Sequence, residues 1–533
     1  MITLNVIVPQ PIWPLARPGQ ADDWCERVNR GRLGDPRPSR QPAGHRAETK
    51  PMRILLIQPD YQIAGFGFRL AAMPEPLHLE VLAGGLPDHD VRILDMRIEA
   101  NLMSLLEQFQ PHLVGVTALT TEVYTARDVL MAVKNYSEEI FTVVGGHHCT
   151  LMPEDFQIPQ TDAIAIGEGE FVLPELVAAL SAGGNLAKVP NLIWRNRDGR
   201  FVRNNRSVGA ERSMDNLALP RRDLVTQYRQ DYFFLFDKPD SSVAASRGCP
   251  YKCNFCSVHE FYGGRTRQMS AGRVMDEIRA VDTRHITFVD DNFLMNHRRE
   301  NELADLIRGE GMDMSFSMEA RSDSIVRHPE LVEKWVDIGL YAVLMGLEGA
   351  TEQALANVNK SNMLETNNQA IRILKANGVI IWGAFIVDPM WSAEDFKKLQ
   401  DYVHQMEITH TQFTVLTPLV GTQLYRERFN DLLTYDYTCY DTLHAVTPTR
   451  LPRTDFYKHF ANLYKQTDLG PYYDLVRAGK LTIEDCRRGK RMLDAMSHWE
   501  YYLDKDPVLG TVRSKAEALP GAVAAYQRSA RAQ

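Results

Sequence analysis

Two stretches of the chain alternate short apolar runs with helix-like segments, and this alternation limits the possible folds more than any other feature. The first stretch has five runs rich in Val, Ile and Leu, at 53–58, 91–96, 113–119, 141–146 and 163–170. The second stretch has six, at 242–248, 285–293, 314–321, 342–350, 379–389 and 411–419. Strands that alternate with helices form parallel sheets covered by helices. The sequence therefore predicts two α/β domains.

The two series predict different architectures. Residues 52–190 fit a doubly wound, Rossmann-like sheet, whose ligands lie beyond the carboxyl ends of the strands. Six strands over residues 242–435 are too few for a complete eight-stranded barrel and fit a partial α/β barrel that is open on one side. The other segments are a linker in which a small hairpin can form, an α-helical region and a flexible tail, at 191–241, 436–505 and 506–533.

Composition narrows the class of protein. Residues 1–51 are rich in Pro, Arg and Gly without periodicity, which predicts a disordered or spurious extension before Met52. The chain is 44% hydrophobic with a formal net charge of −8, as in a soluble globular protein, and this charge disfavours nucleic-acid binding. No apolar run is long enough for a transmembrane helix. Seven cysteines without a secretory signal indicate a cytoplasmic protein, where clustered cysteines bind metal or act in catalysis.

Three of the cysteines are concentrated in residues 246–265, which read SRGCPYKCNFCSVHEFYGGR, at Cys249, Cys253 and Cys256. A structural zinc site needs four ligands, usually as two pairs, but Cys439 and Cys486 stand alone. A thiol redox motif would leave Cys249 unexplained. A 4Fe–4S cluster held by three thiolates leaves one iron open for a ligand. The spacing favours the cluster over zinc.

Cys-x3-Cys-x2-Cys after the first strand of a barrel resembles the radical S-adenosylmethionine enzymes, including the aromatic Phe255 before the last cysteine. The resemblance implies that the three cysteines ligate a 4Fe–4S cluster. Its open iron would chelate S-adenosylmethionine, which is cleaved to a 5′-deoxyadenosyl radical. Asp290 or Asp291 in VDDN would contact the amino group of this cofactor. Arg321 in MEAR would pair with its carboxylate, and Glu348 in GLEG would contact its ribose. The alternative for each is a salt bridge or a strand-end cap.

A doubly wound domain ahead of such a barrel resembles the subclass with an amino-terminal cobalamin-binding domain. The strand-end motifs VTALTTE, GGHHCT and GEGE supply the candidate contacts Thr117, Gly145, Gly146, His147 and Glu168. Glycine-rich strand ends let a planar ligand approach the backbone. A nucleotide is the alternative ligand, but LIQPDYQIAGFG does not form the G-x-G-x-x-G motif that opens a helix.

One motif of other cobalamin domains is missing. The Asp-x-His-x-x-Gly loop is absent, because the second strand is followed by DMRIEAN. No histidine is therefore expected to ligate cobalt from below. His147 and His148 are expected to contact the corrin or its tail rather than the cobalt.

The two cofactors together imply methylation of an unactivated carbon, with one S-adenosylmethionine supplying the methyl group and a second the radical. Residues from about 52 to 500 also resemble the hopanoid C-3 methylases, including FIVDPMW and TPTRLPRTDFYKHFANLYKQT. Two alternatives remain open. One is the anaerobic oxidative cyclase that builds the fifth ring of chlorophyll precursors, and the other is a non-enzymatic cobalamin or cluster sensor.

The hopanoid resemblance also implies partners. These are an apolar polycyclic lipid as substrate, a flavodoxin- or ferredoxin-type electron donor, and peripheral contact with the inner face of the membrane. Aromatic residues of the helical region could line a lipid pocket, although ordinary packing in a core is the favoured interpretation: Tyr457, Phe460, Tyr464, Tyr472, Tyr473 and Trp499. The basic run CRRGKR could touch anionic lipid, but a solvated helix surface is favoured.

Overall fold

The computed structural model describes most of the chain from residue 50 to residue 510. The described ranges are 50–61, 72–205, 213–234, 237–361, 363–408, 410–467, 470–477, 479 and 482–510. The predicted disorder before Met52 and the predicted flexible tail lie outside them, except for residues 50–51 and 506–510.

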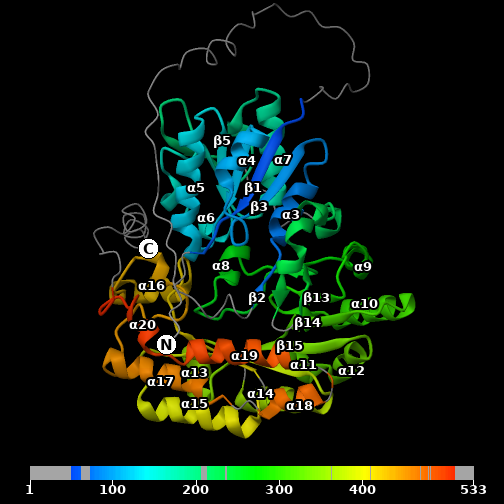
Figure 1. The fold of residues 1–533 in the computed structure, drawn as a ribbon, viewed down its shortest axis with the longest axis vertical. Helices are drawn as coiled ribbons and strands as arrows, with labels where there is room; N and C mark the ends of the chain where they lie inside the picture. The colour runs from blue at the N-terminus through cyan, green and yellow to red at the C-terminus, as the bar shows by residue number, and fades with distance from the viewer. Residues whose placement is uncertain are drawn as a thin grey trace, which may run out of the picture.

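The first domain contains a seven-stranded sheet in the order β3-β1-β4-β5-β6-β7-β8. Its blue and cyan strands and helices form the upper part of the molecule (Figure 1). Five parallel strands coincide with the predicted runs: β1 (Arg53–Gln58), β3 (Asp90–Asp95), β4 (Leu113–Thr117), β5 (Phe141–Gly145) and β6 (Ala163–Ala165). The antiparallel hairpin of β7 (Leu192–Arg195) and β8 (Phe201–Arg203) pairs with β6. The first domain is predicted to end at residue 190, but its sheet continues through the hairpin.

Side chains alternate between the two faces of this sheet. Leu55 and Ile57 of β1 belong to the core beneath α4 (Leu102–Phe109) and α5 (Val123–Tyr136). Ile54 and Leu56 belong to the core beneath α3 (Leu77–Gly84) and α7 (Gly169–Ser181). An apolar run without alternation therefore predicts a strand covered on both faces. The connections diverge from β1 and β4, which makes their carboxyl ends the topological switch point.

The second domain is an open parallel sheet of six strands in chain order, as predicted for a partial barrel. Its strands are β10 (Asp240–Val243), β13 (His285–Phe288), β14 (Ser315–Glu319), β15 (Leu340–Glu348), β16 (Ile380–Val387) and β17 (His410–Val415). Its covering helices include α9 (Ala271–Arg279), α10 (His297–Glu310), α12 (Pro329–Asp337), α14 (Leu364–Ala376) and α15 (Ala393–Met406).

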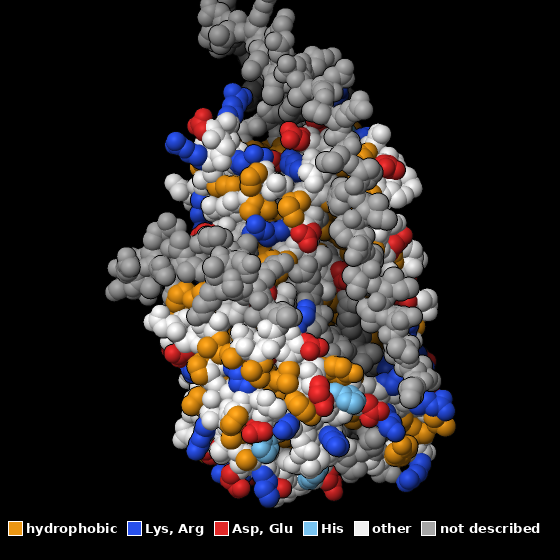
Figure 2. Space-filling model, turned by 60° about the vertical axis from the view of Figure 1, so that its left-hand side comes forward, with side chains coloured by type: hydrophobic (Ala, Val, Ile, Leu, Met, Phe, Trp, Pro, Cys, Tyr) orange, Lys and Arg blue, Asp and Glu red, His pale blue; other side chains and the backbone are white. Residues whose placement is uncertain are grey.

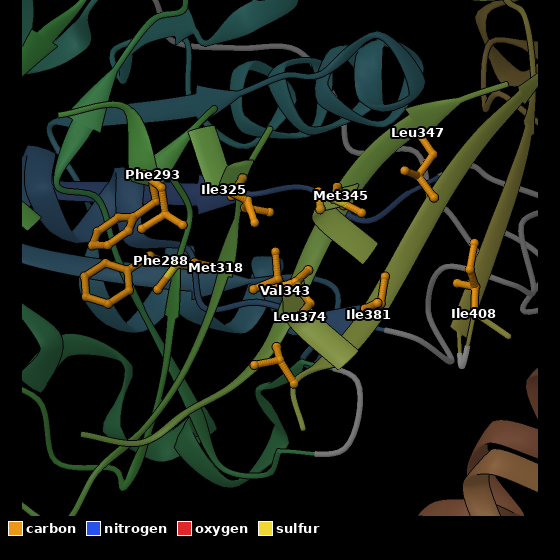
Figure 3. Packing of buried hydrophobic residues seen from close by; sticks show 14 of the residues in the cluster. Phe288, Phe293, Met318, Ile325, Val343, Met345, Leu347, Leu374, Ile381 and Ile408 are labelled. Atoms are coloured by element: carbon orange, nitrogen blue, oxygen red, sulfur yellow. The ribbon is translucent and has the colours of Figure 1, made fainter. Parts of the chain in front are cut away.

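The barrel strands separate an apolar outer layer from a mixed interior. Phe288, Met318, Val343 and Met345 are buried in the layer between strands and helices (Figure 3). The intervening residue Leu344 is only partly buried. The period of two along each strand therefore leaves one row of side chains facing the inside of the barrel, where a ligand can reach them.

The helical region comprises α17 (Arg453–Lys465), α18 (Gly470–Arg477), α19 (Ile483–Met496) and α20 (Glu500–Leu503). Tyr457, Phe460 and Tyr464 are buried in the barrel's main core. This confirms the interpretation of these three as ordinary core residues. In the basic run of α19, Arg487 and Arg491 both pair with Glu484 on the helix surface.

The segment before α17 joins both domains. Tyr425, Tyr437 and Tyr440 are buried in the same core as α4 and α5 of the first domain. The Tyr437 hydroxyl donates to Asp155 Oδ2 at 2.6 Å, and the same carboxylate lies 3.0 Å from His148 Nε2. The C-terminal part of the chain thus holds the first domain against the barrel.

The described helices are too short or too polar to cross a membrane. On the face that Figure 2 presents, hydrophobic side chains are interspersed with charged ones. Several exposed large apolar side chains belong to the C-terminal region: Tyr473, Ile483, Tyr501, Val508 and Leu509.

Candidate active site between the two domains

The three clustered cysteines lie on the loop between β11 (Ser246–Arg247) and α8 (Val258–Tyr262). Gly248 turns the chain into this loop with φ +82°, and a Cβ there would lie 2.1 Å from the Arg265 carbonyl oxygen. Only glycine fits such a close approach in this backbone conformation. The GCP sequence therefore has a structural reason that is independent of any metal.

Backbone hydrogen bonds fix the loop without help from the thiols. The Asn254 N–H donates to the Val358 carbonyl at 3.3 Å, and the Leu424 N–H donates to the Asn254 carbonyl at 2.9 Å. The Asn359 side-chain amide donates to the Lys252 carbonyl at 2.7 Å. The loop is thus attached to segments about one hundred or more residues away in the sequence.

The three thiols lie close enough to influence one another. Burial raises the pKa of Cys256 to about 12, with further increases from Cys253 and Cys249. Burial also raises the pKa of Cys249 and of Cys253. Three desolvated, neighbouring thiols become thiolates only when a strong cationic centre stabilises them, and iron supplies such a centre. The donor set therefore fits a cluster. Among the described side chains, no three His, Cys, Asp or Glu residues form a site for a single metal ion.

Two cations lie beside Cys253. Lys360 and Arg321 both lower the pKa of this thiol against the effect of burial. The Arg321 guanidinium stacks 3.5 Å from the Tyr251 ring centroid, and its Nε donates to Asp323 at 2.9 Å. Its buried Nη2 has no hydrogen-bond partner among the described residues. A buried guanidinium nitrogen without a hydrogen-bond partner next to the cysteine loop is available to bind the carboxylate of S-adenosylmethionine, the contact predicted for Arg321.

The two aspartates of VDDN have different environments. Asp290 is 1% exposed and accepts hydrogen bonds from the Ala245 N–H at 3.0 Å and from the Ser246 hydroxyl. Asp291 is less buried and accepts from the Gly248 N–H at 3.0 Å. Asp290 therefore holds in place, through hydrogen bonds, the start of β11, which leads into the cysteine loop. Asp291 is the better placed of the two to meet a ligand.

Glu348 ends β15 in a strained conformation. Its φ of +61° is rare for a residue other than glycine, and such strain often occurs at functional sites. Lys360 Nζ donates to Glu348 Oε1 at 2.8 Å and to the Gly346 carbonyl at 2.9 Å. Glu348, the predicted ribose contact, is thus held in place by Lys360, which also lies close to Cys253.

Glu319, at the end of β14, is a candidate that sequence reasoning missed. Its side chain is accessible, but protein crowds around it, and this desolvation followed by the Asp291 carboxylate raises the pKa of Glu319 to about 8. It lies two residues before Arg321 in the MEAR motif. Its place at the end of β14 puts this carboxyl group at the mouth of the barrel, near Asp291. Phe255, by contrast, packs in a small apolar cluster with Val358 and Leu424.

The strand ends of the first domain face the cysteine loop. Helix α6 (His147–Leu151) lies next to α8 (Figure 1). His147 of α6 stacks on Phe261 of α8 with ring centroids 5.3 Å apart. Glu168 accepts from Arg247 Nη1 at 2.7 Å and also pairs with Arg267. Glu168 therefore links the domains through ion pairs, and its contact with a cofactor stays a prediction. The carboxyl ends of both sheets thus meet across one interface.

Glycines at the end of β5 have different roles. A Cβ on Gly146, whose φ is +101°, would lie 2.7 Å from Thr117 Oγ1 and 3.1 Å from the Ala118 backbone. A Cβ on Gly145 would meet Ala165 at an ordinary 3.5 Å. The absence of a side chain at Gly146 therefore serves close packing against the end of β4, where Thr117 lies.

This difference predicts that Gly146→Ala destabilises the protein by about 2–3 kcal/mol, because it combines a clash with an unfavourable φ. Gly145→Ala is the matched control and should change the stability far less. Thermal or denaturant unfolding of the two variants measures the difference. Equal effects from both substitutions would contradict the packing role of Gly146.

Comparisons with known proteins agree with this geometry. A B12 binding domain model matches residues 69–177, and a radical SAM superfamily model matches residues 243–403. The predicted cofactors, cobalamin and a cluster with S-adenosylmethionine, correspond to these two domains. The first match covers most of the first domain, and the second covers most of the barrel.

Three curated relatives cover most of this chain. The hopanoid C-3 methylase of Methylococcus capsulatus is 31% identical over 72% of this chain and 74% of its own length. An uncharacterized methyltransferase of Pyrococcus horikoshii is 31% identical over 74% of this chain and 88% of its own length. The anaerobic magnesium-protoporphyrin IX monomethyl ester cyclase of Rubrivivax gelatinosus is 27% identical over 75% of this chain and 74% of its own length.

Two solved structures share the fold. The radical S-adenosylmethionine methyltransferase TsrM of Kitasatospora setae, with cobalamin and a [4Fe-4S] cluster bound, has a TM-score of 0.57 at 20% identity, covering 71% of this chain and 74% of that one. The cobalamin-dependent S-adenosylmethionine radical enzyme OxsB has a TM-score of 0.63 at 15% identity, covering 90% of this chain and 84% of that one. At these identities the likeness describes the architecture alone.

Proposed function

The chain belongs to the cobalamin-dependent radical S-adenosylmethionine methyltransferases, and on that premise we propose that it methylates a hopanoid at C-3 of ring A. The observation that carries the methyl-transfer geometry is the contact of His147 with Phe261, because it brings the strand ends of the first domain to the cysteine loop. The 31% identity with the Methylococcus capsulatus hopanoid C-3 methylase supports the substrate.

When bound, the cluster with S-adenosylmethionine supplies a 5′-deoxyadenosyl radical, and cobalamin supplies the methyl group. The chain's own residues bind and orient. Cys249, Cys253 and Cys256 would hold the cluster. Arg321 would orient the carboxylate of S-adenosylmethionine and Glu348 its ribose, with Asp291 near the amino group. This chemistry requires both cofactors and the substrate to meet at the interface between the two domains, since reacting atoms must come within about 3–3.5 Å.

The side chains around the interface suit an apolar substrate. Leu119, beyond β4, is 47% exposed, and Val289, at the end of β13, is also 47% exposed. Leu344 and Ile386 occupy partly buried positions that alternate with core residues on β15 and β16. Exposed apolar side chains at the strand ends of both domains indicate a ligand with a large apolar surface.

The partners of this reaction remain proposals. Exposed apolar side chains of the C-terminal region, such as Ile483 and Leu509, support peripheral contact with the membrane that holds the lipid. A flavodoxin- or ferredoxin-type electron donor stays a prediction.

A product analysis tests this function. With a hopanoid that carries deuterium at C-3, we expect 5′-deoxyadenosine and S-adenosylhomocysteine in a one-to-one ratio for each methylated hopanoid. Deuterium should appear in the deoxyadenosine, because the radical removes hydrogen from the carbon that becomes methylated. Mass spectrometry of the nucleosides and the lipid measures all three products.

The control reaction contains an unrelated triterpene-free lipid extract and should give no methylated product. Deoxyadenosine without S-adenosylhomocysteine, together with an oxidised and unmethylated product, would favour the cyclase-type activity of the Rubrivivax gelatinosus relative. Formation of both deoxyadenosine and S-adenosylhomocysteine with a different lipid as substrate would support methyl transfer but contradict the hopanoid as the substrate.

A further inference from the structure

Two arginines lie opposite each other on the short hairpin that leads into the cysteine loop. Strands β11 and β12 (Arg267–Gln268) are antiparallel, and Arg247 is the register partner of Arg267. Like charges directly opposite each other on paired strands destabilise the pair. The hairpin therefore needs negative charges from another part of the chain to hold both guanidinium groups on the same side.

The first domain supplies these negative charges. Arg247 Nη1 donates to Glu168 Oε1 at 2.7 Å and also pairs with Glu170. Arg267 pairs with Glu168 as well, and its guanidinium carbon lies 5.9 Å from the centre of the Phe171 ring. The two glutamates and Phe171 belong to the start of α7. We call Glu168, Glu170, Arg247 and Arg267 the interdomain ion network.

The interdomain ion network is balanced in charge and largely shielded from water. Two carboxylates face two guanidinium groups, and the four side chains are between 10% and 16% exposed. Removal of one partner from such a group leaves a charge without compensation, which is unfavourable. Charged groups arranged across an interface fix its register more than they raise its affinity. The network is therefore suited to fix how the two domains are aligned.

Both sides of the network are attached to the candidate active site. Arg247 is followed by Gly248, whose N–H donates to Asp291 at 3.0 Å, and then by the first cysteine of the loop. On the other side, the Gly167 N–H donates to Thr150 Oγ1 at 2.9 Å. Thr150 belongs to α6, the helix that stacks on α8 through its histidine. A shift within the network would therefore move the cysteine loop relative to the strand ends of the first domain.

We propose that the four residues of the interdomain ion network are positioning residues that fix the distance between the two cofactors. This inference rests on the proposed methyl transfer and is independent of the hopanoid substrate. A misplacement of about 1 Å can slow a reaction by about 100-fold. Loss of the network should therefore impair methyl transfer, while the iron–sulfur cluster and cobalamin still bind to their own domains.

Electron paramagnetic resonance of the full-length protein, loaded with both cofactors, tests this positioning without substrate. A reduced iron–sulfur cluster is paramagnetic and accelerates the relaxation of nearby cob(II)alamin, an effect that decreases steeply with distance. The microwave power that half-saturates the cob(II)alamin signal is measured with the iron–sulfur cluster oxidised and after its reduction by dithionite. We expect this power to increase on reduction in the wild type.

Neutral substitutions on either side of the interface should weaken this effect. Arg267→Met removes a positive charge from the barrel side, and Glu170→Gln removes a negative charge from the first domain. Both variants should lose most of the relaxation effect at wild-type contents of iron and cobalamin. Arg267→Lys keeps the charge and should retain the effect. With the hopanoid, methyl transfer should fall by about 100-fold in the two neutral variants, and deoxyadenosine should exceed S-adenosylhomocysteine.

Lys134→Met is the matched control, because it breaks an ion pair of similar burial within the first domain. Lys134 Nζ lies 2.6 Å from Asp162 Oδ2, and the two side chains are 12% and 16% exposed. Asp162 directly precedes β6, at the edge of the sheet that faces away from the barrel. This variant should keep both the relaxation effect and the product ratio of the wild type.

Several results would overturn the positioning role. An unchanged relaxation effect in both Arg267→Met and Glu170→Gln is one, and an equal loss in Lys134→Met is another. Loss of cobalamin from the neutral variants would indicate direct binding instead of positioning. A wild type that holds both cofactors without any relaxation effect would also contradict it. If the wild type shows the effect but methylates no hopanoid, the proposed substrate is wrong, while the relaxation measurements still decide the positioning role.

Discussion

Joint replacement of Cys249, Cys253 and Cys256 by alanine should remove the cluster completely. After anaerobic reconstitution, we expect the iron content to fall from about four per chain to near zero, and S-adenosylmethionine cleavage to disappear with it. The physical reason is that the three thiols are the only cysteine side chains that the structure gathers within its described part. Iron analysis and the absorbance of the reconstituted protein provide the measurement.

The fold should survive this change, which keeps the result interpretable. The hydrogen bonds that anchor the loop run through Asn254 and Asn359, and none of them uses a thiol. The triple variant should therefore unfold like the wild type and still bind cobalamin in its first domain. Retention of a full complement of iron by the triple variant would rule out these ligands.

Single substitutions elsewhere are the matched controls. Cys486, on the surface helix α19, can become alanine without loss of iron. The buried thiols Cys149 and Cys439 should also be dispensable for the cluster, although their removal leaves small cavities. Cys25 lies outside the described residues, and we likewise expect its replacement to leave the cluster intact.

The sequence was sufficient to predict the fold because the signal for each strand is local. Runs such as 53–58 are apolar without alternation, since helices cover both sides of the sheet. The hairpin of β7 and β8 was visible as a pattern, but its attachment to β6 was not. Pairing between strands depends on contacts across the chain, which a single sequence does not record.

The site was predictable only in part, for a related reason. The cysteine spacing is a local motif and can be recognised directly. The role of a strand-end carboxylate depends on what lies opposite it, so Glu168 meets Arg247 of the other domain, and Asp290 is enclosed by its own loop. Glu319 belongs to the MEAR motif, but the motif pointed to Arg321 alone as a contact. The interest of Glu319 comes from its being accessible and desolvated together, a property that exists only in the folded protein.

The second large effect is expected at Arg321. Replacement by alanine should weaken the binding of S-adenosylmethionine to the cluster-loaded protein by about 10- to 100-fold, the usual worth of hydrogen bonds to a charged group. Its orphaned Nη2 beside Cys253 is the available donor for the carboxylate. Arg321→Lys should restore only part of the affinity, because an ammonium group cannot provide the planar fork or the stacking on Tyr251.

Arg327 provides a closely matched control, because it is an exposed arginine that pairs with the same Asp323 carboxylate, at 3.2 Å. The Arg327 side chain faces solvent, and Arg327→Ala removes one positive charge from the surroundings of Asp323. The affinity for S-adenosylmethionine should therefore change little. Calorimetric titration measures both variants, and their iron content shows that the cluster is intact. Equal losses of affinity in the two variants would indicate that Asp323 and its fixed loop, rather than the Arg321 guanidinium, govern binding. An unchanged affinity in Arg321→Ala would assign the carboxylate to Lys360, the other cation beside Cys253.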